Sequence, residues 1–187
     1  MALKPAVFLD RDGTLNVEKN YLHRIEDWEW ITGAPLAIKA LRNQGFTIIV
    51  VTNQSGIARG MYGRDDVEKL HDYVNAELAK LGTKIDAFYF CPHHQNFGEA
   101  CDCRKPKAGM LFEAAKNHSI DLGRSWLIGD KSIDCEAALV AGVKPILVKT
   151  GHGVREALEI TGSQIVVDDI VAACGKILQQ LKGQNTL

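Results

Sequence analysis

The sequence predicts an α/β fold in which a central, mainly parallel sheet lies between two layers of helices. Short apolar runs alternate along the chain with stretches of helical periodicity. The apolar runs are nearly continuous, which is typical of strands buried on both faces. Polar residues suited to phosphate or metal chemistry follow several of these runs, where such sheets bind their ligands.

Six apolar runs are predicted as strands, at residues 6–10, 46–52, 87–91, 125–130, 145–150 and 164–169. Helical patterns occupy residues 34–43, 64–81, 109–117, 132–141 and 170–181. Strands and helices that alternate in this way predict a parallel sheet with right-handed crossover connections.

The length of 187 residues and a hydrophobic content of 46% fit one domain, taken as residues 1–187. Residues 15–31 contain Tyr21, Trp28 and Trp30. We expect them to form a packed hairpin or short flap after the first strand. The chain leaves no room for a large cap domain, so the site is expected to be an open cleft.

Charge and hydropathy narrow the class of partner. Lys and Arg number 22 against 23 Asp and Glu, which does not favour nucleic acid or an anionic membrane surface. No stretch approaches the roughly 18 apolar residues of a membrane helix, and the N-terminal apolar run is too short for a secretory signal. We therefore expect a cytoplasmic monomer that acts on a small molecule.

The stretch VFLDRDGTLN, residues 7–16, ends the first predicted strand with Asp10 and Asp12. A carboxylate at this position can attack phosphorus and form an acyl phosphate, a role that fits Asp10. If the chain stays extended, Asp12 points to the same face and can protonate the leaving alkoxide, then take a proton from water. The alternative is an acidic turn, because Asp and Gly are common turn residues.

Thr52 ends the second predicted strand and begins the segment TNQSG. Its hydroxyl and the following backbone N–H groups can hold phosphoryl oxygens. The alternative is that Thr52 and Ser55 only cap a turn or a helix.

Arg104 and Lys105 lie in the segment CRKPKAG, directly before Pro106, which predicts an extended loop ahead of a helix. Lys105 can neutralise the transferred phosphoryl group, which leaves Arg104 to bind elsewhere on the substrate. The alternative is a solvated pair of charges.

Asp130 follows the fourth predicted strand in the segment IGDKSIDCEAA. Attack of a carboxylate on a phosphate brings two anions together and therefore needs a divalent cation. Asp10 and Asp130 offer the hard oxygen ligands that suit magnesium. Asp134 either supports this site or is only an acid at the start of a helix.

One loop, at about residues 91–105, collects four metal-binding side chains, Cys91, His93, Cys101 and Cys103. They are enough for a closed tetrahedral zinc site, which is structural because no position remains for water. Such a site would brace Arg104 and Lys105. The alternative is unligated thiols or a redox pair, and the two other cysteines, Cys135 and Cys174, are interpreted as small buried residues.

The motifs DRDGT, VVTNQSG, CRKP and IGDKSID, in this order, resemble the four motifs of the haloacid dehalogenase-like phosphatases. The resemblance implies a Rossmann-like three-layer sandwich and an aspartyl-phosphate mechanism. It also implies that Asp10 is the nucleophile, Asp12 the acid/base, and Thr52 and Lys105 the phosphoryl stabilisers. Asp10, Asp12 and Asp130 would then form the magnesium site.

The zinc loop before CRKP resembles two branches of this superfamily, the heptose bisphosphate phosphatases and the histidinol-phosphate phosphatases. The segment TNQSGIARG, residues 52–60, is similar to the heptose branch, because the histidinol branch usually has an acid in place of Ser55. This resemblance implies removal of the 7-phosphate of D-glycero-D-manno-heptose 1,7-bisphosphate, to give heptose 1-phosphate, in lipopolysaccharide synthesis. The implied substrate contacts are Glu18, Lys19, Asn20, Tyr21, Thr52, Asn53, Gln54, Ser55, Arg104, Lys105 and Lys131.

Two alternatives to this function remain at the level of sequence. A histidinol-phosphate phosphatase would use the same chemistry on another substrate. A zinc-stapled module could instead bind a phosphorylated ligand without turnover. The sequence does not distinguish the α from the β anomer of the sugar.

Overall fold

The computed structural model describes residues 2–98, 100–159 and 164–184. Six strands form one sheet in the order β3-β2-β1-β4-β5-β6, and each neighbouring pair is parallel. The strands are β1 (Ala6–Leu9), β2 (Thr47–Asn53), β3 (Ala87–Cys91), β4 (Trp126–Gly129), β5 (Lys144–Val148) and β6 (Ile165–Val167). Each lies within two residues of a predicted run, so the predicted parallel sheet is confirmed.

The helices also follow the predicted pattern, with one addition. They are α1 (Ala34–Asn43), α2 (Arg64–Ala79), α3 (Gly109–His118), α4 (Ser132–Val140), α5 (Gly153–Glu159) and α6 (Ile170–Gln184), with 3-10 turns η1 (Ile25–Asp27) and η2 (Leu122–Arg124). Helix α5 was not predicted. It is seven residues long and only its first residue, Gly153, is buried, so it has no apolar periodicity to detect.

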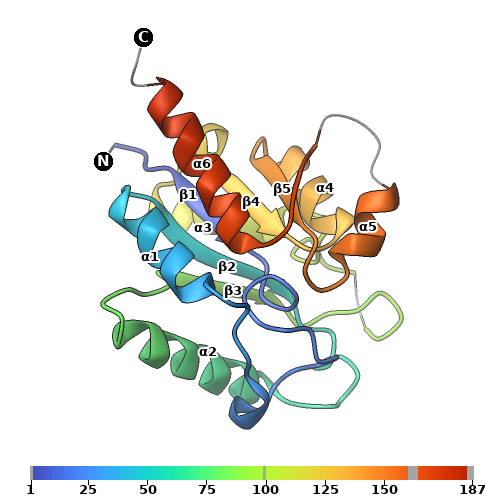
Figure 1. Cartoon of the computed structure of the whole chain (residues 1–187). Coiled ribbons are helices and arrows are strands. Elements are labelled where there is room, and N and C mark those ends of the chain that lie inside the picture. The colour runs from blue at the N-terminus through green and yellow to red at the C-terminus, as the bar shows by residue number, and fades with distance from the viewer. Residues whose placement is uncertain (1, 99, 160–163, 185–187) are drawn as a thin grey trace.

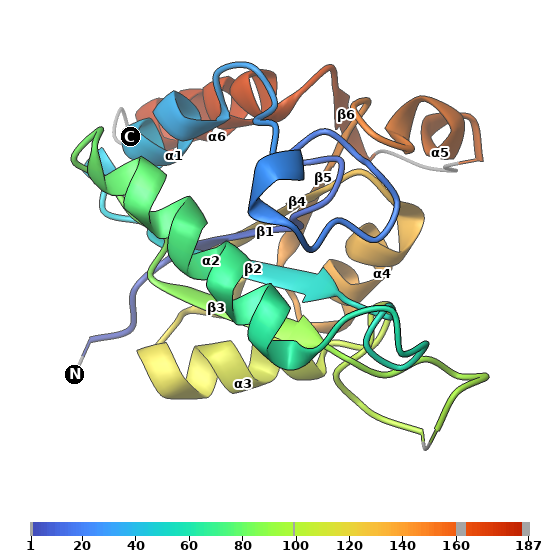
Figure 2. The ribbon, with the colours of Figure 1, turned by 90° about the horizontal axis from the view of Figure 1, so that it is seen from below.

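The sheet lies between two layers of helices, which Figure 2 shows from below. Alternate side chains of β1 point to opposite faces: Val7 and Leu9 join the core beneath α1 and α6, whereas Ala6 and Phe8 join the core beneath α3 and α4. Strands covered on both faces must be apolar throughout, which explains the continuous runs in the sequence. None of the described helices is long and apolar enough to cross a membrane.

The strand order creates a switch point between β1 and β4. From β1 the chain proceeds to β2 and β3 on one side, and from β4 to β5 and β6 on the other (Figure 1). In open parallel sheets the crevice at the carboxyl ends of such a pair of strands binds the ligand. Asp10 and Asp130 are the residues that directly follow these two strands.

The segment at residues 15–31 is a short flap that is closed at its base. The amide of Val17 donates to the carbonyl of Glu29, at 2.8 Å, and Asn16 pairs with Trp30 in an antiparallel bridge. Trp28 and Trp30 meet edge to face, with ring centroids 5.0 Å apart, and both pack against the core. The predicted packed flap is therefore confirmed, and it stands beside the carboxyl end of β2 (Figure 2).

Candidate active site

A hollow of about 290 Å³ opens at the carboxyl ends of the strands. Loops that are far apart in the sequence contribute its walls, as the parallel topology requires. Its lining residues are Asp10, Asp12, Glu18, Asn20, Tyr21, Thr52, Asn53, Gln54, Ser55, Tyr62, Arg104, Lys105, Lys131, Ile133, Asp134 and His152.

Lys105 joins two carboxylates at the floor of this hollow. Its Nζ lies 2.7 Å from Asp10 Oδ1 and 2.6 Å from Asp134 Oδ1, and it also donates to the carbonyl of Val51. All three charged side chains are almost completely buried. Burial lowers the pKa of the lysine, but the two carboxylates outweigh it and raise that pKa above its ordinary value, so the ammonium stays charged.

Asp134 has two partners, and they show whether it supports the site or is only an acid at the start of a helix. Besides the pair with Lys105, its Oδ2 accepts the backbone N–H of Lys131, at 3.1 Å, and so caps α4. Burial raises the pKa of Asp134 to about 6, although Lys105 opposes the shift. Asp134 is thus both a helix-start acid and a support for Lys105.

Asp12 stands at the edge of the hollow and is held by three side chains. Arg11 donates to both of its oxygens, at 3.0 and 2.9 Å from Nη2, while Asn16 and Gln54 each donate one further hydrogen bond. Burial raises the pKa of Asp12, but the Arg11 charge and these bonds leave it below its ordinary value. The carboxylate is therefore ionised and fixed in direction.

The side chain of Gln54 is buried, and its amide nitrogen and oxygen are already engaged in hydrogen bonds with neighbouring side chains. Its Nε2 donates to Thr52 Oγ1, at 2.9 Å, as well as to Asp12, and its Oε1 accepts from the hydroxyl of Tyr62, at 2.8 Å. Thr52 therefore faces the hollow with its hydroxyl hydrogen still available to donate. The amide of Asn53 is likewise committed, since it exchanges two hydrogen bonds with the backbone of Lys105.

Asp130 is fully buried beside the hollow, between two glycines. Its Oδ2 accepts the backbone N–H of His152, at 2.8 Å, whereas Oδ1 is buried and has no hydrogen-bond partner among the residues that the structure describes. A Cβ added to Gly13 or to Gly151 would lie 2.3 Å from Oδ2, and both glycines have positive φ. The glycine of DRDGT is thus required for close approach to Asp130.

The residues around Asp130 fit a divalent cation. Carboxylate oxygens of Asp10, Asp130 and Asp134 all lie within 4.8 Å of one another. Burial, followed by the charge of Asp10, raises the pKa of Asp130 to about 8, although the charge of Lys131 opposes the shift. Hard oxygen ligands with an unpartnered buried carboxylate oxygen are the donor set that suits magnesium.

The loop that follows β3 gathers the four predicted zinc ligands. Cys91 Sγ lies 3.7 Å from Cys101 Sγ and 3.7 Å from His93 Nδ1, which is 3.4 Å from Cys103 Sγ. Ligands of a tetrahedral zinc with bonds of about 2.3 Å are about 3.8 Å apart, so the cluster has the right size. Glu99, inside this loop, lies outside the described residues.

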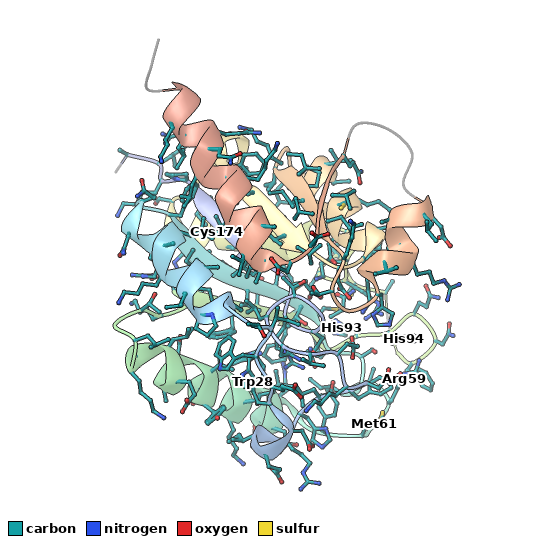
Figure 3. All side chains as sticks on the ribbon, viewed as in Figure 1. Trp28, Arg59, Met61, His93, His94 and Cys174 are labelled. Atoms are coloured by element: carbon teal, nitrogen blue, oxygen red, sulfur yellow. The ribbon has the colours of Figure 1, made fainter. Side chains whose placement is uncertain are left out.

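His94 and the two remaining cysteines lie outside this cluster. Figure 3 shows His94 beside Arg59, and the two side chains approach to 3.3 Å on the surface. Cys174 lies on α6, well away from His93 (Figure 3), and is buried, as is Cys135. The small buried character predicted for these two cysteines is confirmed.

Arg104 joins the zinc loop to the hollow. Its Nη1 donates to the carbonyl of His93, at 3.0 Å, while the residue also lines the hollow. Lys131 also lines the hollow, and its Nζ is 3.7 Å from Glu18 Oε2. The hollow that contains Asp10 therefore has two further cations in its lining.

Of the four substrate contacts predicted in the flap, three line the hollow and one does not. Asn20 and Tyr21 line the hollow with left-handed backbones, at φ 50° and 59°, a costly conformation that a packed loop must hold in place. Glu18 Oε1 accepts the N–H of Asn20, at 2.8 Å. Lys19 does not line the hollow, because its Nζ pairs with Glu29 at 2.9 Å.

Sequence reasoning missed four residues at this site, Arg11, Asn16, Tyr62 and His152. Arg11 and Asn16 belong to the DRDGT segment and its continuation, and both hold the carboxylate of Asp12 by hydrogen bonds. His152 follows the glycine after β5, and its ring lies 3.3 Å from Asp130 and 3.8 Å from Glu18. Its position directly after a strand-end glycine was the signal available in the sequence.

Two family models match the chain. The model described as HAD-hydrolase-like matches residues 102–173, and that described as polynucleotide kinase 3 phosphatase matches residues 5–137. Together they cover the four motifs around the hollow.

Curated relatives and a solved structure are also similar. The D-glycero-beta-D-manno-heptose-1,7-bisphosphate 7-phosphatase of Photorhabdus laumondii is 41% identical over 87% of this chain and 89% of its own. The Escherichia coli K12 enzyme of the same name is 43% identical over 83% and 84% of the two chains. The crystal structure of D,D-heptose 1.7-bisphosphate phosphatase from B. bronchiseptica, complexed with magnesium and phosphate, has a TM-score of 0.87 and 32% identity, over 94% of this chain and 99% of that one.

Proposed function

The chain belongs to the haloacid dehalogenase-like phosphatases, together with the heptose bisphosphate 7-phosphatases that it matches over most of their length, and from this premise we propose its substrate. That substrate is D-glycero-D-manno-heptose 1,7-bisphosphate. The protein removes the 7-phosphate and leaves heptose 1-phosphate. The product would serve the synthesis of a bacterial surface glycan such as lipopolysaccharide.

The observation that carries this proposal is the buried group formed by Asp10, Lys105 and Asp134. Asp10 follows β1 at the switch point of the sheet, and the ammonium of Lys105 lies 2.7 Å from its Oδ1. A carboxylate that opens into a hollow and is paired with a fixed cation suits nucleophilic attack on a phosphate. A binding module without turnover would have no use for a nucleophile at this point.

In the first step, the free carboxylate oxygen of Asp10 attacks phosphorus and the bond to the sugar oxygen breaks. Asp12 is ionised in the free site, but the negative charge of the bound phosphate favours its protonated form, which donates the proton to the leaving alkoxide. The hydroxyl of Thr52 and the ammonium of Lys105 bind the phosphoryl oxygens. These donors stabilise the charge that develops as the bond breaks.

In the second step, Asp12 takes a proton from water, and the resulting hydroxide attacks the phosphorus of the aspartyl phosphate. Inorganic phosphate leaves and Asp10 is restored as a free carboxylate. Arg11, Asn16 and Gln54 hold Asp12 in one direction through both proton transfers. One residue thus serves as acid and then as base.

We propose that two metals complete the site. Asp10, Asp12 and Asp130 would hold magnesium, which supplies charge neutralisation for the attack of an anion on an anion. Asp12 would do so through its backbone carbonyl, because its carboxylate is engaged by Arg11, Asn16 and Gln54. Cys91, His93, Cys101 and Cys103 would hold zinc as a structural metal that braces Arg104 and Lys105. Thiolate ligands of zinc fit a reducing compartment, and we propose that the protein acts in the cytoplasm.

The second phosphate of the substrate needs a cation away from Asp10. Arg104 and Lys131 both line the hollow and are available for this phosphate. Glu18, Asn20, Tyr21 and Ser55 would contact the sugar. Three other predicted contacts would support neighbouring residues instead of touching the substrate, because their side chains are already engaged. Lys19 pairs with Glu29, Asn53 bonds to the backbone of Lys105, and Gln54 donates to Asp12.

We further propose that residues 1–187 work as one phosphatase domain and as a monomer. All of the proposed catalytic groups come from one chain and converge on one hollow. The flap at residues 15–31 and the zinc loop at about residues 91–105 then serve as walls of the site rather than as separate units.

The experiment that tests this function is a substrate panel. Phosphate release is measured with both anomers of heptose 1,7-bisphosphate and with histidinol phosphate, at saturating magnesium. We expect kcat/KM to favour one heptose bisphosphate anomer by at least about a hundredfold over histidinol phosphate. A preference for histidinol phosphate would contradict the proposed substrate while leaving the phosphatase chemistry intact.

A further inference from the structure

An exposed arginine, Arg59, connects three loops beside the hollow. It lies in the loop between β2 and α2, where its backbone N–H donates to the carbonyl of Ser55, at 3.2 Å. Ser55 itself lines the hollow. The side chain of Arg59 contacts both the flap and the zinc loop. Because its backbone is tied to a residue of the wall, Arg59 is placed to hold the two other loops in a set position.

The contact with the flap is made to Tyr21. The guanidinium carbon of Arg59 is 5.8 Å from the centroid of the Tyr21 ring, within the range of a cation–π interaction. Tyr21 lines the hollow, yet it is 38% exposed and its backbone is left-handed. A tyrosine in this conformation is held by its surroundings and not by its own backbone preference. Arg59 is therefore one of the groups that fix this ring.

The contact with the zinc loop is made at its tip, residues 94–97. The N–H of Phe97 donates to the carbonyl of His94, at 2.9 Å, and closes a tight turn. The guanidinium carbon of Arg59 is 4.8 Å from the centroid of the Phe97 ring. Its Nη2 lies 3.3 Å from His94 Nε2, and Figure 3 shows these two residues side by side. Phe97 does not line the hollow, so Arg59 gives the tip a route to Tyr21.

We propose that Arg59 is a positioning residue for substrate binding, which holds the Tyr21 ring in the wall of the hollow by bridging it to the tip of the zinc loop. Arg59 does not line the hollow, so it acts through Tyr21 and not by touching the substrate. The inference rests on the proposed function, in which Tyr21 contacts the sugar. The side chains proposed for phosphoryl transfer have other partners, so Arg59 affects affinity for the sugar and not the chemical steps.

The kinetic test removes the cation. In Arg59→Met, with the heptose 1,7-bisphosphate anomer that the wild type prefers, we expect KM to rise about fivefold and kcat to stay within about twofold. Arg59→Lys keeps a cation and should recover part of this change. Inhibition by inorganic phosphate, which needs only the end of the hollow near Asp10, should be unchanged. A wild-type KM in Arg59→Met, or a fall in kcat as large as the rise in KM, would overturn the role of Arg59.

Arg64→Met is the matched control. Arg64, at the start of α2, is also exposed, and its guanidinium carbon lies 4.9 Å from the centroid of the Phe90 ring. The variant thus loses the same kind of contact outside the flap and the zinc loop, and its KM should equal that of the wild type. Failure of the wild type to hydrolyse either heptose anomer would contradict the proposed function. A wild type that hydrolyses one of them, with equal KM in Arg59→Met and Arg64→Met, would contradict only the role of Arg59.

A double-mutant cycle tests the bridge to the zinc loop. Phe97→Leu removes one of the two rings that Arg59 contacts, so it should raise KM about twofold in the wild-type background. In Arg59→Met the bridge is already broken, and Phe97→Leu should then leave KM unchanged. The same factor in both backgrounds would show that Phe97 does not act through Arg59.

A spectroscopic test does not depend on turnover. The chain has four tyrosines, so labelling with 3-fluorotyrosine gives few ¹⁹F resonances, and Tyr21→Phe identifies that of Tyr21. We expect this resonance to shift in Arg59→Met and also in Phe97→Leu, although Phe97 belongs to another loop. Arg64→Met should leave it in place. A Tyr21 resonance that Phe97→Leu does not move would overturn the bridge, whatever the substrate of the enzyme.

Discussion

Lys105 Nζ lies 2.6 Å from Asp134 Oδ1 in a site where both side chains are almost fully buried. The same nitrogen lies 2.7 Å from Asp10 Oδ1, so one cation neutralises the proposed nucleophile and the residue that caps α4. This geometry ties the end of β1, the loop after the zinc cluster and the start of α4 to one point. The first two predictions follow from it.

Lys105→Met should lower kcat by roughly a hundredfold to a thousandfold, because it removes a fixed donor from the developing phosphoryl charge. The free energy of unfolding should also fall, since Asp10 and Asp134 lose their buried partner. Steady-state kinetics and circular dichroism measure the two effects.

Lys107→Met is the matched control. Lys107 is exposed and pairs with Asp102, so the kcat of this variant should equal that of the wild type. A Lys105→Met enzyme with wild-type kcat would refute this role.

Asp134→Asn and Asp134→Ala separate the two functions of this carboxylate. The asparagine can still accept the N–H of Lys131 but no longer carries the charge that faces Lys105, so we expect kcat to fall about tenfold. The alanine also loses the helix cap, which should lower the free energy of unfolding by about 1 kcal/mol more. Equal stability of the two variants in chemical denaturation would show that the cap contributes nothing.

Asp10→Asn should abolish phosphate release with the fold retained, because an amide does not attack phosphorus. The control is Asp102→Asn, which alters an acid in the zinc loop whose side chain is 96% exposed. That variant should keep the wild-type rate. Trapping of labelled phosphate on the wild-type protein, and none on Asp10→Asn, would support the aspartyl phosphate. Residual turnover in Asp10→Asn above about one thousandth of wild type would argue for another nucleophile.

Much of the fold could be predicted from sequence because burial on two faces leaves a direct pattern. Runs such as the one that ends at Asp10 are apolar at every position, and their order along the chain gives the parallel topology. The short helix α5 lacked such a pattern. The strand order itself became clear only from the structure, because no local pattern states which strands are neighbours.

The grouping of side chains was predictable where their chemistry is distinctive: the structure brings together the four proposed zinc ligands, and it places Asp130 close to Asp10. A residue of the site was not predictable where its role is to hold another side chain in place. The hydrogen bonds of Arg11, Asn16 and Gln54 to Asp12 are set by tertiary packing. From sequence alone, these side chains look like ordinary polar residues of a loop. The pairing of Lys19 with Glu29 has the same origin.

The zinc prediction concerns the loop that holds Arg104. Purified protein should contain about one zinc per chain, and Cys101→Ser should reduce that content and lower the melting temperature. Because Arg104 donates to the carbonyl of His93, loss of zinc should also raise KM more than it lowers kcat. Metal analysis, thermal unfolding and kinetics measure these effects.

Cys174→Ser is the matched control for this experiment. Cys174 is a buried cysteine on α6, remote from the zinc loop (Figure 3), so its replacement should leave the zinc content unchanged. Metal-free wild-type protein with a full set of free thiols and an unchanged melting temperature would contradict a structural zinc.

The last prediction concerns stability and pH, and it follows from the burial of His71. Burial lowers the pKa of this histidine from 6.5 to about 3, so between these values the unfolded chain binds a proton that the folded protein does not. The contribution of His71 to the free energy of unfolding is therefore fully present above pH 6.5 and is lost progressively as the pH falls toward 3. His71→Phe has no such proton to bind. The difference in stability between wild type and His71→Phe, measured by urea unfolding at intervals from pH 7 to pH 4, should therefore change in favour of the variant as the pH falls. A difference that stays constant over this range would mean that His71 titrates alike in the folded and unfolded chains.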